Sequence, residues 1–374
     1  MGPKLINNRA RVIAFYLPQF HSIPENDMWW GNGFTEWTSV RNAKPLFKGH
    51  IQPKVPGELG YYNLLDSGIR EKQAELARYA GIEGFCYWHY WFGNGKRLLE
   101  RPFDEVLSIG KPDFPFCLGW ANHSWSRKTW TKYKKGGNQM LIEQLYPGEE
   151  DIIAHFNNVL PAFKDPRYIT VDGKPLFLIW APMDLKDPKL FMEKWEELAR
   201  QNGLSGVHFV GLKGGPVKNW SSPLSIGFDA VCWENFWMAE YNASFIKTRL
   251  YPRLQRYLDT SFFLRKYDYK DIIKDYFSDV DSKENVYPTI IANYDRSPRG
   301  GRQAVIFYNS NPDLFRDHIE QALSVVSCKQ PEHRILFLRS WNEWGEGNYV
   351  EPDSEFGRLY LDVLHDCLMQ NLHQ

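Results

Sequence analysis

Three carboxylates lie close together near the end of the chain, in the segment Trp341–Pro352. They are Glu343 and Glu346, with a Trp and a Gly between them, and Glu351. The apolar run 335–338 comes just before and predicts a buried strand, and the Asn, Gly and Pro residues after it predict a loop beyond the strand's carboxyl end. A carboxyl group desolvated by aromatic neighbours can keep its proton while a nearby one stays ionised. Two such groups flanking a bond can cleave a glycosidic linkage; the alternative interpretation is a surface turn with a capping Glu and buried Trp anchors.

Aromatic and polar side chains also follow the earlier apolar runs. The chain has fifteen Trp, and 16% of its residues are aromatic. Rigid amphipathic rings suit a site that stacks on flat apolar ligand faces, as sugars present, although an aromatic-rich core is the alternative. Glu36 could instead form a salt bridge to an arginine, and Glu351 could instead orient its loop. The residues that we expect to contact the substrate are Tyr16, Glu36, Trp37, Trp88, His89, Trp120, Asn122, Trp341, Trp344 and Glu351.

Eight short apolar runs alternate with helical patterns and would position these residues. We predict the strands near 12–16, 84–89, 114–120, 175–180, 206–211, 228–233, 288–293 and 335–340. The alternation predicts an α/β fold, a single (β/α)8 TIM-type barrel over residues 1–374, with a helical insertion near 236–285. An open doubly wound sheet is the alternative, but the chain has no GxGxxG turn or P-loop.

Composition limits the classes of partner. The formal net charge is zero with no basic block, which argues against nucleic acid and anionic membrane as main partners. No run of 18 apolar residues occurs, so we expect no membrane span. Five cysteines without a CxxC pair predict reduced, buried thiols. We therefore expect a cytoplasmic protein, or a periplasmic one if a signal peptide has been removed.

Two patterns bear on metals. The histidines are scattered without HxH or HExxH spacing, so we expect no metal and no cofactor. Asp279-Val280-Asp281 matches the DxD of metal- and nucleotide-binding glycosyltransferases. It lies in a polar stretch and does not follow an apolar strand, so we interpret it as a solvated loop.

Several motifs together resemble a known family. The sequence resembles glycoside hydrolase family 99-like proteins of the WbsX type in Phe15–His21, Gly33–Trp37, Gly84–Trp91, Trp120–Asn122, Gly173–Pro175 and Trp341–Gly347. Family 99 proper contains retaining endo-α-mannosidases. The resemblance implies that Glu343 acts as a base on the sugar's own 2-hydroxyl, giving an anhydro-sugar intermediate. It also implies that Glu346 protonates the leaving oxygen.

The resemblance predicts a glycan-active enzyme, a retaining glycoside hydrolase or transglycosylase whose substrate is an oligo- or polysaccharide. The WbsX branch is often found with polysaccharide-biosynthesis genes and labelled glycosyltransferase. A glycosyltransferase of bacterial polysaccharide, O-antigen or lipopolysaccharide biosynthesis is therefore one alternative. A non-catalytic carbohydrate-binding barrel is another, although the presence of both Glu343 and Glu346 argues against it. The loops after the fifth to seventh strands, including Trp233–Asn235, depart from family 99, so mannose specificity does not carry over.

Overall fold

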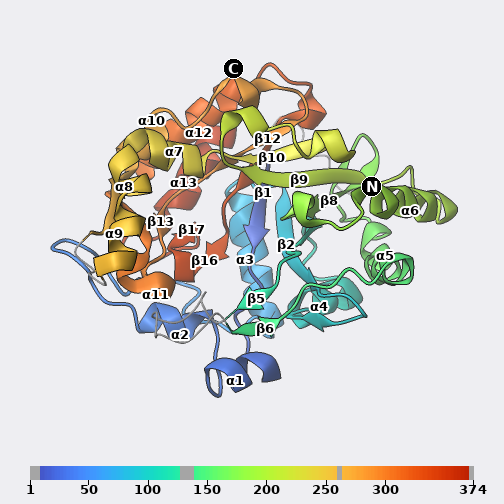
Figure 1. The fold of residues 1–374 in the computed structure, drawn as a ribbon, viewed down its shortest axis with the longest axis horizontal. Helices are drawn as coiled ribbons and strands as arrows, with labels where there is room; N and C mark the ends of the chain where they lie inside the picture. Colours follow the sequence, from blue (N-terminus) through green and yellow to red (C-terminus); the bar gives the residue numbers. More distant parts are fainter. Residues whose placement is uncertain (1–8, 127–138, 259–262, 370–374) are drawn as a thin grey trace.

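The computed structural model describes residues 9–126, 139–258 and 263–369. Its centre is a closed barrel of parallel strands, each paired with the next in chain order, with the last paired to the first (Figure 1). The predicted (β/α)8 barrel is confirmed. The barrel strands are β1 (Arg11–Tyr16), β2 (Gly84–Trp91), β4 (Phe116–Trp120), β8 (Lys174–Ile179), β9 (His208–Gly214), β10 (Ala230–Glu234), β12 (Val286–Ile290) and β15 (Ile335–Leu338).

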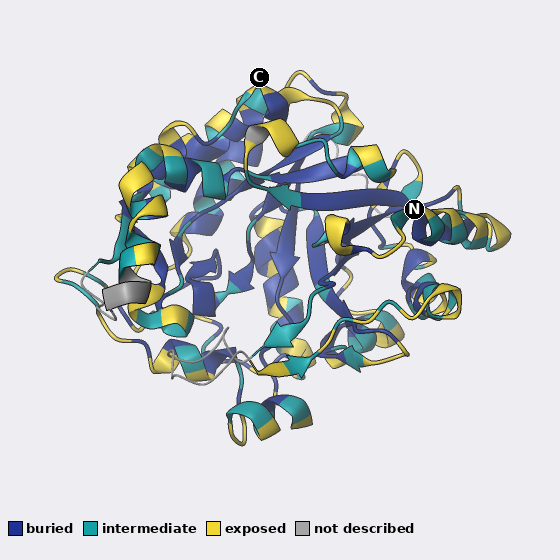
Figure 2. Cartoon of the chain, in the orientation of Figure 1, coloured by how far each residue is buried: buried dark blue, intermediate teal, exposed yellow. Residues whose placement is uncertain are grey.

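The barrel strands are buried on both faces, because side chains fill the interior and helices cover the outside. Every residue of β4, β12 and β15 is buried, and the strands form the dark centre of Figure 2. The longer helices are α3 (Ser67–Tyr79), α4 (Arg101–Ile109), α5 (Glu149–Phe163), α6 (Pro188–Gln201), α12 (Pro312–Val326) and α13 (Leu359–Met369).

Side-chain caps fix where several of these helices begin. The Asp66 carboxylate accepts from the Gly68 amide at the start of α3, and Asn311 accepts from the Leu314 amide at the start of α12. The closing helix, α13, begins at Leu359. Before it, the Asp353 carboxylate accepts hydrogen bonds from the backbone amides of Glu355 and Phe356. These bonds hold the backbone there in a turn.

The seventh predicted strand, 288–293, is shifted. Strand β12 ends at Ile290, and the chain continues into β13 (Tyr294–Asp295), which pairs antiparallel with β14 (Val305–Tyr308). Strand β14 pairs with β11 (Arg265–Asp268) in a small second sheet. This sheet holds the short helix α11 (Ser297–Gly300), which lies between β13 and β14 and contains Arg299, with Arg296 just before it.

The helical insertion predicted near 236–285 contains several short helices and one strand. Its helices are α7 (Phe236–Ala243), α8 (Phe245–Arg249), α9 (Tyr251–Leu258) and α10 (Tyr269–Lys274), with strand β11 between α9 and α10. Helices α7, α8 and α9 form the outer left flank of the molecule in Figure 1.

Short elements occupy the remaining loops. The helices and strands there are α1 (Pro24–Trp30), α2 (Glu36–Arg41), β3 (Arg97–Leu98), β5 (Trp125–Ser126), β6 (Met140–Ile142), β7 (Thr170–Val171), β16 (Asn342–Glu343) and β17 (Asn348–Tyr349). The 3-10 helices are η2 (Pro182–Asp184), η3 (Val217–Asn219), η4 (Leu224–Ile226), η5 (Asp279–Ser282), η6 (Gly301–Gln303), η7 (Pro331–His333) and η8 (Trp344–Glu346).

The DxD segment is not the solvated loop that the sequence suggested. Asp281 is fully buried in η5, where its carboxylate accepts from the Ser278 amide and hydroxyl and from Asn235 Nδ2. Its oxygens cap the start of η5, so the prediction of a solvated loop is wrong for Asp281, whereas Asp279 is exposed.

The cysteines are all free thiols, and four of them are buried as expected, while Cys328 is exposed. Among the described residues, none of the helices combines the length and the hydrophobicity that crossing a bilayer requires.

Candidate active site

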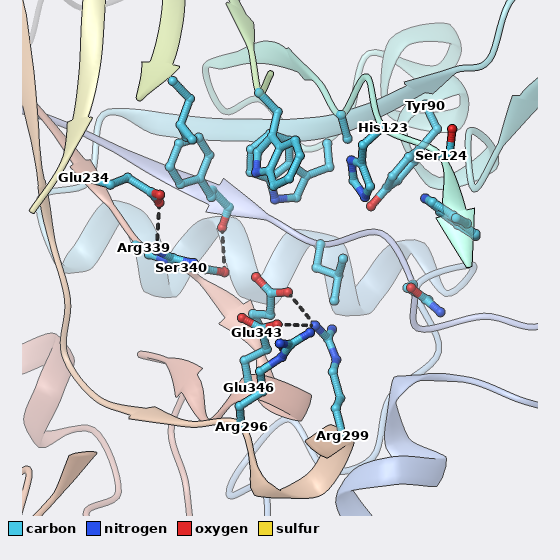
Figure 3. A pocket seen from close by; sticks show the side chains of 18 of the residues that line it. Tyr90, His123, Ser124, Glu234, Arg296, Arg299, Arg339, Ser340, Glu343 and Glu346 are labelled. Carbon is cyan, nitrogen blue, oxygen red and sulfur yellow. Dashed lines mark hydrogen bonds and ion pairs between the residues drawn. The ribbon is translucent and has the colours of Figure 1, made fainter. Parts of the chain in front are cut away.

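A cavity of about 340 Å³ lies at the carboxyl ends of the barrel strands, where (β/α)8 enzymes place their sites (Figure 3). Glu343 and Glu346 both line it, from the loop that follows β15. Arg299 reaches it from α11, and Glu234 reaches it from the end of β10. Charged side chains of both signs therefore converge at one end of the barrel.

The loop with the two glutamates is a short hairpin. Strand β16 pairs with β17, and η8 fills the turn between them. Gly347 ends η8 with φ of 53°, and a Cβ there would lie 2.8–2.9 Å from Asp295 atoms, so glycine fits best. A Cβ on Gly345 would lie 1.5 Å from Glu36 Oε1. The two glycines of the motif thus let neighbouring segments pack directly against this loop.

Arg299 joins three carboxylates. Its Nη1 donates to Glu343 Oε1 at 3.0 Å and to Glu346 Oε1 at 2.8 Å, and its Nε donates to Glu36 Oε1 at 2.9 Å. The Arg299 side chain is 7% exposed and that of Glu36 is fully buried. Arg299 therefore faces three carboxylates at once, a cluster in which protonation of one acid would relieve the excess negative charge.

Two further arginines border the cavity. Arg296 Nε lies 3.1 Å from Glu346 Oε1, and Arg339 Nη1 lies 2.8 Å from Glu234 Oε1. Both are ion pairs, and Figure 3 shows the Arg339–Glu234 pair at the far side of the cavity from Arg299. Within the described part of the chain, Glu346 consequently has ion pairs with two guanidinium groups and Glu343 has one, with Arg299.

The proton affinities of the two glutamates differ accordingly. Burial, with the nearby negative charge of Glu346, raises the pKa of Glu343 to about 7. Burial also acts to raise the pKa of Glu346, but the charges of Arg299, Arg296 and Arg339 hold it below its usual value. Two titrating groups this close share their protons, so the proton that the pair loses last resides mainly on Glu343.

Aromatic side chains form the cavity wall opposite the charges. They come from β1, β2, β5 and the end of β8, and they are Phe15, Trp88, Tyr90, Trp125 and Trp180. The rings of Phe15 and Trp88 are stacked with centroids 4.8 Å apart. Burial lowers the pKa of His123 to about 4, so this cavity residue is neutral and can exchange hydrogen bonds.

Of the expected substrate contacts, Trp88 lines the cavity. Glu36 does not line it, but accepts a hydrogen bond from Arg299, which does. The salt-bridge alternative weighed for Glu36 is the arrangement observed.

Several others point outward, away from the barrel interior. The Tyr16 hydroxyl donates to Gln73 Oε1 at 2.7 Å, and His89 Nε2 lies 2.9 Å from Nε2 of His155. Trp120 Nε1 donates to the Trp91 carbonyl at 2.9 Å. These side chains are not in the cavity, because strand neighbours alternate between the two faces.

Trp37 and Asn122 hold loops. Trp37 Nε1 donates to the Tyr62 carbonyl at 2.8 Å. Asn122 pairs with the backbone of Ala181 in both directions, accepting at 2.7 Å and donating at 2.9 Å. Both side chains are buried and lie outside the cavity lining, so they position loops around the site.

Trp341 and Trp344 were expected to contact the substrate and to wall the two glutamates. Trp341 is fully buried against Phe85, and Trp344 stacks on Tyr349 with centroids 3.6 Å apart. Neither lines the cavity, so the expected Trp341 or Trp344 wall is wrong.

Glu351 anchors this loop. Its carboxylate accepts from Trp344 Nε1 at 2.6 Å, Gln73 Nε2 at 2.6 Å and the Tyr62 hydroxyl at 2.9 Å. It is 1% exposed and burial raises its pKa to about 7. The alternative interpretation, a carboxylate that orients the loop, describes its contacts.

Sequence reasoning missed the arginines and Glu234. Glu234 and Arg339 each occur beside the end of an apolar run, which is the signal that could have found them. Arg296 and Arg299 gave no comparable signal, because the second sheet places them.

Fold and cavity together define a (β/α)8 barrel with a charged, aromatic-lined cavity at the carboxyl ends of its strands. The chain superposes on a glycoside hydrolase-like protein with TM-score 0.62 and 15% identity, covering 98% of this chain and 97% of that one. It superposes on a GH99 endo-α-mannosidase from Bacteroides thetaiotaomicron with TM-score 0.54 and 15% identity, covering 95% of each. At this identity the likeness concerns the fold.

The profile of the family described as "Glycosyltransferase WbsX" matches residues 12–364, and the chain belongs to that family of glycan-active proteins. The chain is also 33% identical over 360 residues to "Uncharacterized protein WxcX" of Xanthomonas campestris pv. campestris strain B100. The match covers 96% of this chain and 50% of that protein, so the chain spans about half the length of the curated relative.

Proposed function

We propose that this protein breaks glycosidic bonds in an oligo- or polysaccharide, with Glu343 and Glu346 as the reacting carboxylates. The observation that carries the proposal is the sharing of Arg299 Nη1 by two carboxylates that line an aromatic-walled cavity. Glycosidic cleavage needs one carboxyl group that holds a proton and one that is ionised. The unequal ion pairing of Glu343 and Glu346 supports that division.

The closeness of the two groups supports retention of anomeric configuration. Because both Oε1 atoms bond to one nitrogen, at 3.0 and 2.8 Å, they are separated by no more than about 6 Å. Inverting enzymes hold their carboxyl groups ~6.5–9.5 Å apart to admit a water, and direct-nucleophile retaining enzymes ~5–5.5 Å. If the sugar's own 2-hydroxyl is the nucleophile, the carboxyl groups need not keep the ~5–5.5 Å separation, because the base has to reach only that hydroxyl. This route also retains the anomeric configuration.

The division of roles has two versions. The family resemblance implies that Glu346 is the acid and Glu343 the base. The contacts of the unliganded protein favour the reverse, since Glu346 faces two guanidinium groups and Glu343 keeps the proton. We adopt the order that the ion pairs support, with Glu343 as proton donor. Under the family order, substrate binding would first have to move the proton to Glu346.

The cavity wall supports binding of a sugar ring. Trp88 and Tyr90 offer flat apolar surfaces on the side opposite the charged groups. Sugar hydroxyls could bond to His123 and to Ser124, which also line the cavity. The endo-α-mannosidase fold makes α-mannosides the first substrates to test, and hydrolysis or transfer to another sugar would use the same first step.

A glycosyltransferase is the second candidate, because the family description names that activity. A transferase would bind a sugar nucleotide or another activated donor. The DxD segment does not support metal–nucleotide binding, since Asp281 is buried and spends its oxygens on Ser278 and Asn235. The arginines could bind phosphate, but each is already paired with a glutamate.

The test is a screen of α-mannosides and bacterial polysaccharides for released reducing ends, followed by NMR of the first anomer formed. We expect release with retained configuration. Inverted product would refute the retaining mechanism. Tight binding and consumption of a sugar nucleotide, without cleavage of any glycan, would establish the transferase in place of the hydrolase.

A further inference from the structure

An exposed surface on α8 and the start of α9 combines apolar and basic side chains. Phe245 and Ile246 are each 57% exposed and Leu250 is 46% exposed. Arg249 and Arg253 are exposed beside them. We call these five residues the basic apolar patch. Large apolar side chains gathered at a surface usually mark a binding site.

The charge of the patch has one sign. Residues 241–258 contain four basic residues and no Asp or Glu, in a chain whose formal net charge is zero. The preceding acid, Glu240, is buried and paired with Arg265 at 2.7 Å, so it does not offset the patch. A complementary partner must therefore be anionic, with an apolar layer that Phe245 and Ile246 can enter.

The arrangement of the rings favours a bilayer over a glycan. The Arg249 guanidinium lies over the rings of Trp237 and Tyr241, at 5.5 and 5.7 Å from their centroids. A sugar stacks on an open aromatic face, and these faces are covered by a cation. The most exposed groups are two aliphatic side chains and Phe245, which insert between lipid headgroups.

We propose that the basic apolar patch docks the protein on the surface of an anionic lipid bilayer. Phe245, Ile246 and Leu250 enter the boundary between headgroups and acyl chains, and Arg249 and Arg253 contact lipid phosphates. Helix α7 connects this patch to Glu234 in the cavity, so docking holds the cavity near the membrane. Figure 1 places α8 and α9 at the outer edge of the molecule.

The test is flotation of the full chain with vesicles of phosphatidylcholine, with or without added phosphatidylglycerol. The wild type should float with the anionic vesicles, bind neutral ones much more weakly, and lose binding as salt screens the charges. Phe245→Ser with Ile246→Ser should lower partitioning at least about tenfold, since two apolar side chains leave the membrane. Arg249→Gln with Arg253→Gln should lower it about 30-fold, from ~1 kcal/mol per basic residue.

Matched controls come from other helices. Ile109, on α4, is 59% exposed, and Lys72, on α3, is exposed, so Ile109→Ser and Lys72→Gln should leave partitioning unchanged. Thermal melts would verify that every variant is folded. Failure of the wild type to float with anionic vesicles would overturn the proposal. So would equal flotation by the patch variants, or a stable dimer that buries the patch without lipid binding. Glycan cleavage is not part of the readout, so this result is independent of the proposed activity.

Discussion

Replacing Arg296 with Met should move the acid limb of the pH–activity profile upward. Arg296 Nε lies 3.1 Å from Glu346 Oε1, and the cation favours the ionised carboxylate. At that distance the Coulomb energy is about 5 kcal/mol at an effective dielectric of 20, and about 1.3 kcal/mol in bulk water. The Arg296 side chain is 38% exposed, so the effect should be near the lower figure. We expect the pKa of the acid limb to rise by about one unit.

The assay is kcat/KM against pH on a substrate from the screen. The first ionisation of the pair, mainly that of Glu346, sets the acid limb, and loss of the remaining proton, mainly from Glu343, sets the alkaline limb. The alkaline limb should move less than the acid limb, because the ion pair of Arg296 is with Glu346. Arg316→Met is the matched control: its side chain is also 38% exposed, and it pairs with Asp366 at 2.8 Å away from the cavity. An unmoved acid limb, or an equal shift in Arg316→Met, would refute the reasoning.

Three further changes test the site. Glu343→Gln should lose most activity on poor leaving groups and less on activated aryl glycosides, whereas Glu346→Gln should lose activity on both; the opposite pattern would support the order implied by the resemblance. Arg299→Met leaves three clustered carboxylates without their shared cation. Urea denaturation at pH 7 should therefore show a free energy of unfolding lower by roughly 3–5 kcal/mol. An unchanged urea midpoint would contradict this expectation. Burial raises the pKa of Glu351 in the folded protein to about 7, above the ordinary value for a glutamate. Protonated Glu351 therefore contributes about 3 kcal/mol to the free energy of unfolding, fully present below pH ~4.5 and lost as the pH rises through ~7. The free energy of unfolding should decline less steeply with pH in Glu351→Gln than in the wild type. Identical slopes in the two proteins would exclude Glu351 as the source.

The sequence predicted the barrel because its strands are buried on both faces and appear as continuous apolar runs. It predicted Glu343 and Glu346 because a short motif holds both, with the glycines that their packing needs. Apolar runs and short motifs can be found within one short segment of the sequence. Neither prediction required knowing which segments contact each other in the fold.

The side-chain directions were harder to predict. In β1 the cavity residue is Phe15 and its neighbour Tyr16 points outward, and in β2 Trp88 faces inward while His89 points outward. A continuously apolar strand gives no polar alternation that would tell one face from the other. Tyr16 and His89 were therefore selected for their chemistry, although their direction excludes them from the cavity.

The arginine cluster depended on contacts distant in the chain. Arg299 meets Glu36 across 263 residues and Glu343 across 44, after the second sheet has positioned α11. No spacing within the sequence encodes that meeting. The charge balance that divides the two glutamates could therefore be seen only in the folded chain.

The most direct test of the account is the rate of reducing-end release by the wild type, Glu343→Gln and Glu346→Gln on one confirmed unactivated glycan. We expect each substitution to lower kcat by about 10²–10⁴-fold, because each removes a proton-transfer or base function, while substrate binding is kept. The outward-facing Tyr16→Phe should retain near-wild-type activity as a control, since its hydroxyl bonds to Gln73 and not to the cavity. Near-wild-type rates in both glutamate variants would contradict the assignment of Glu343 and Glu346 as the reacting carboxylates.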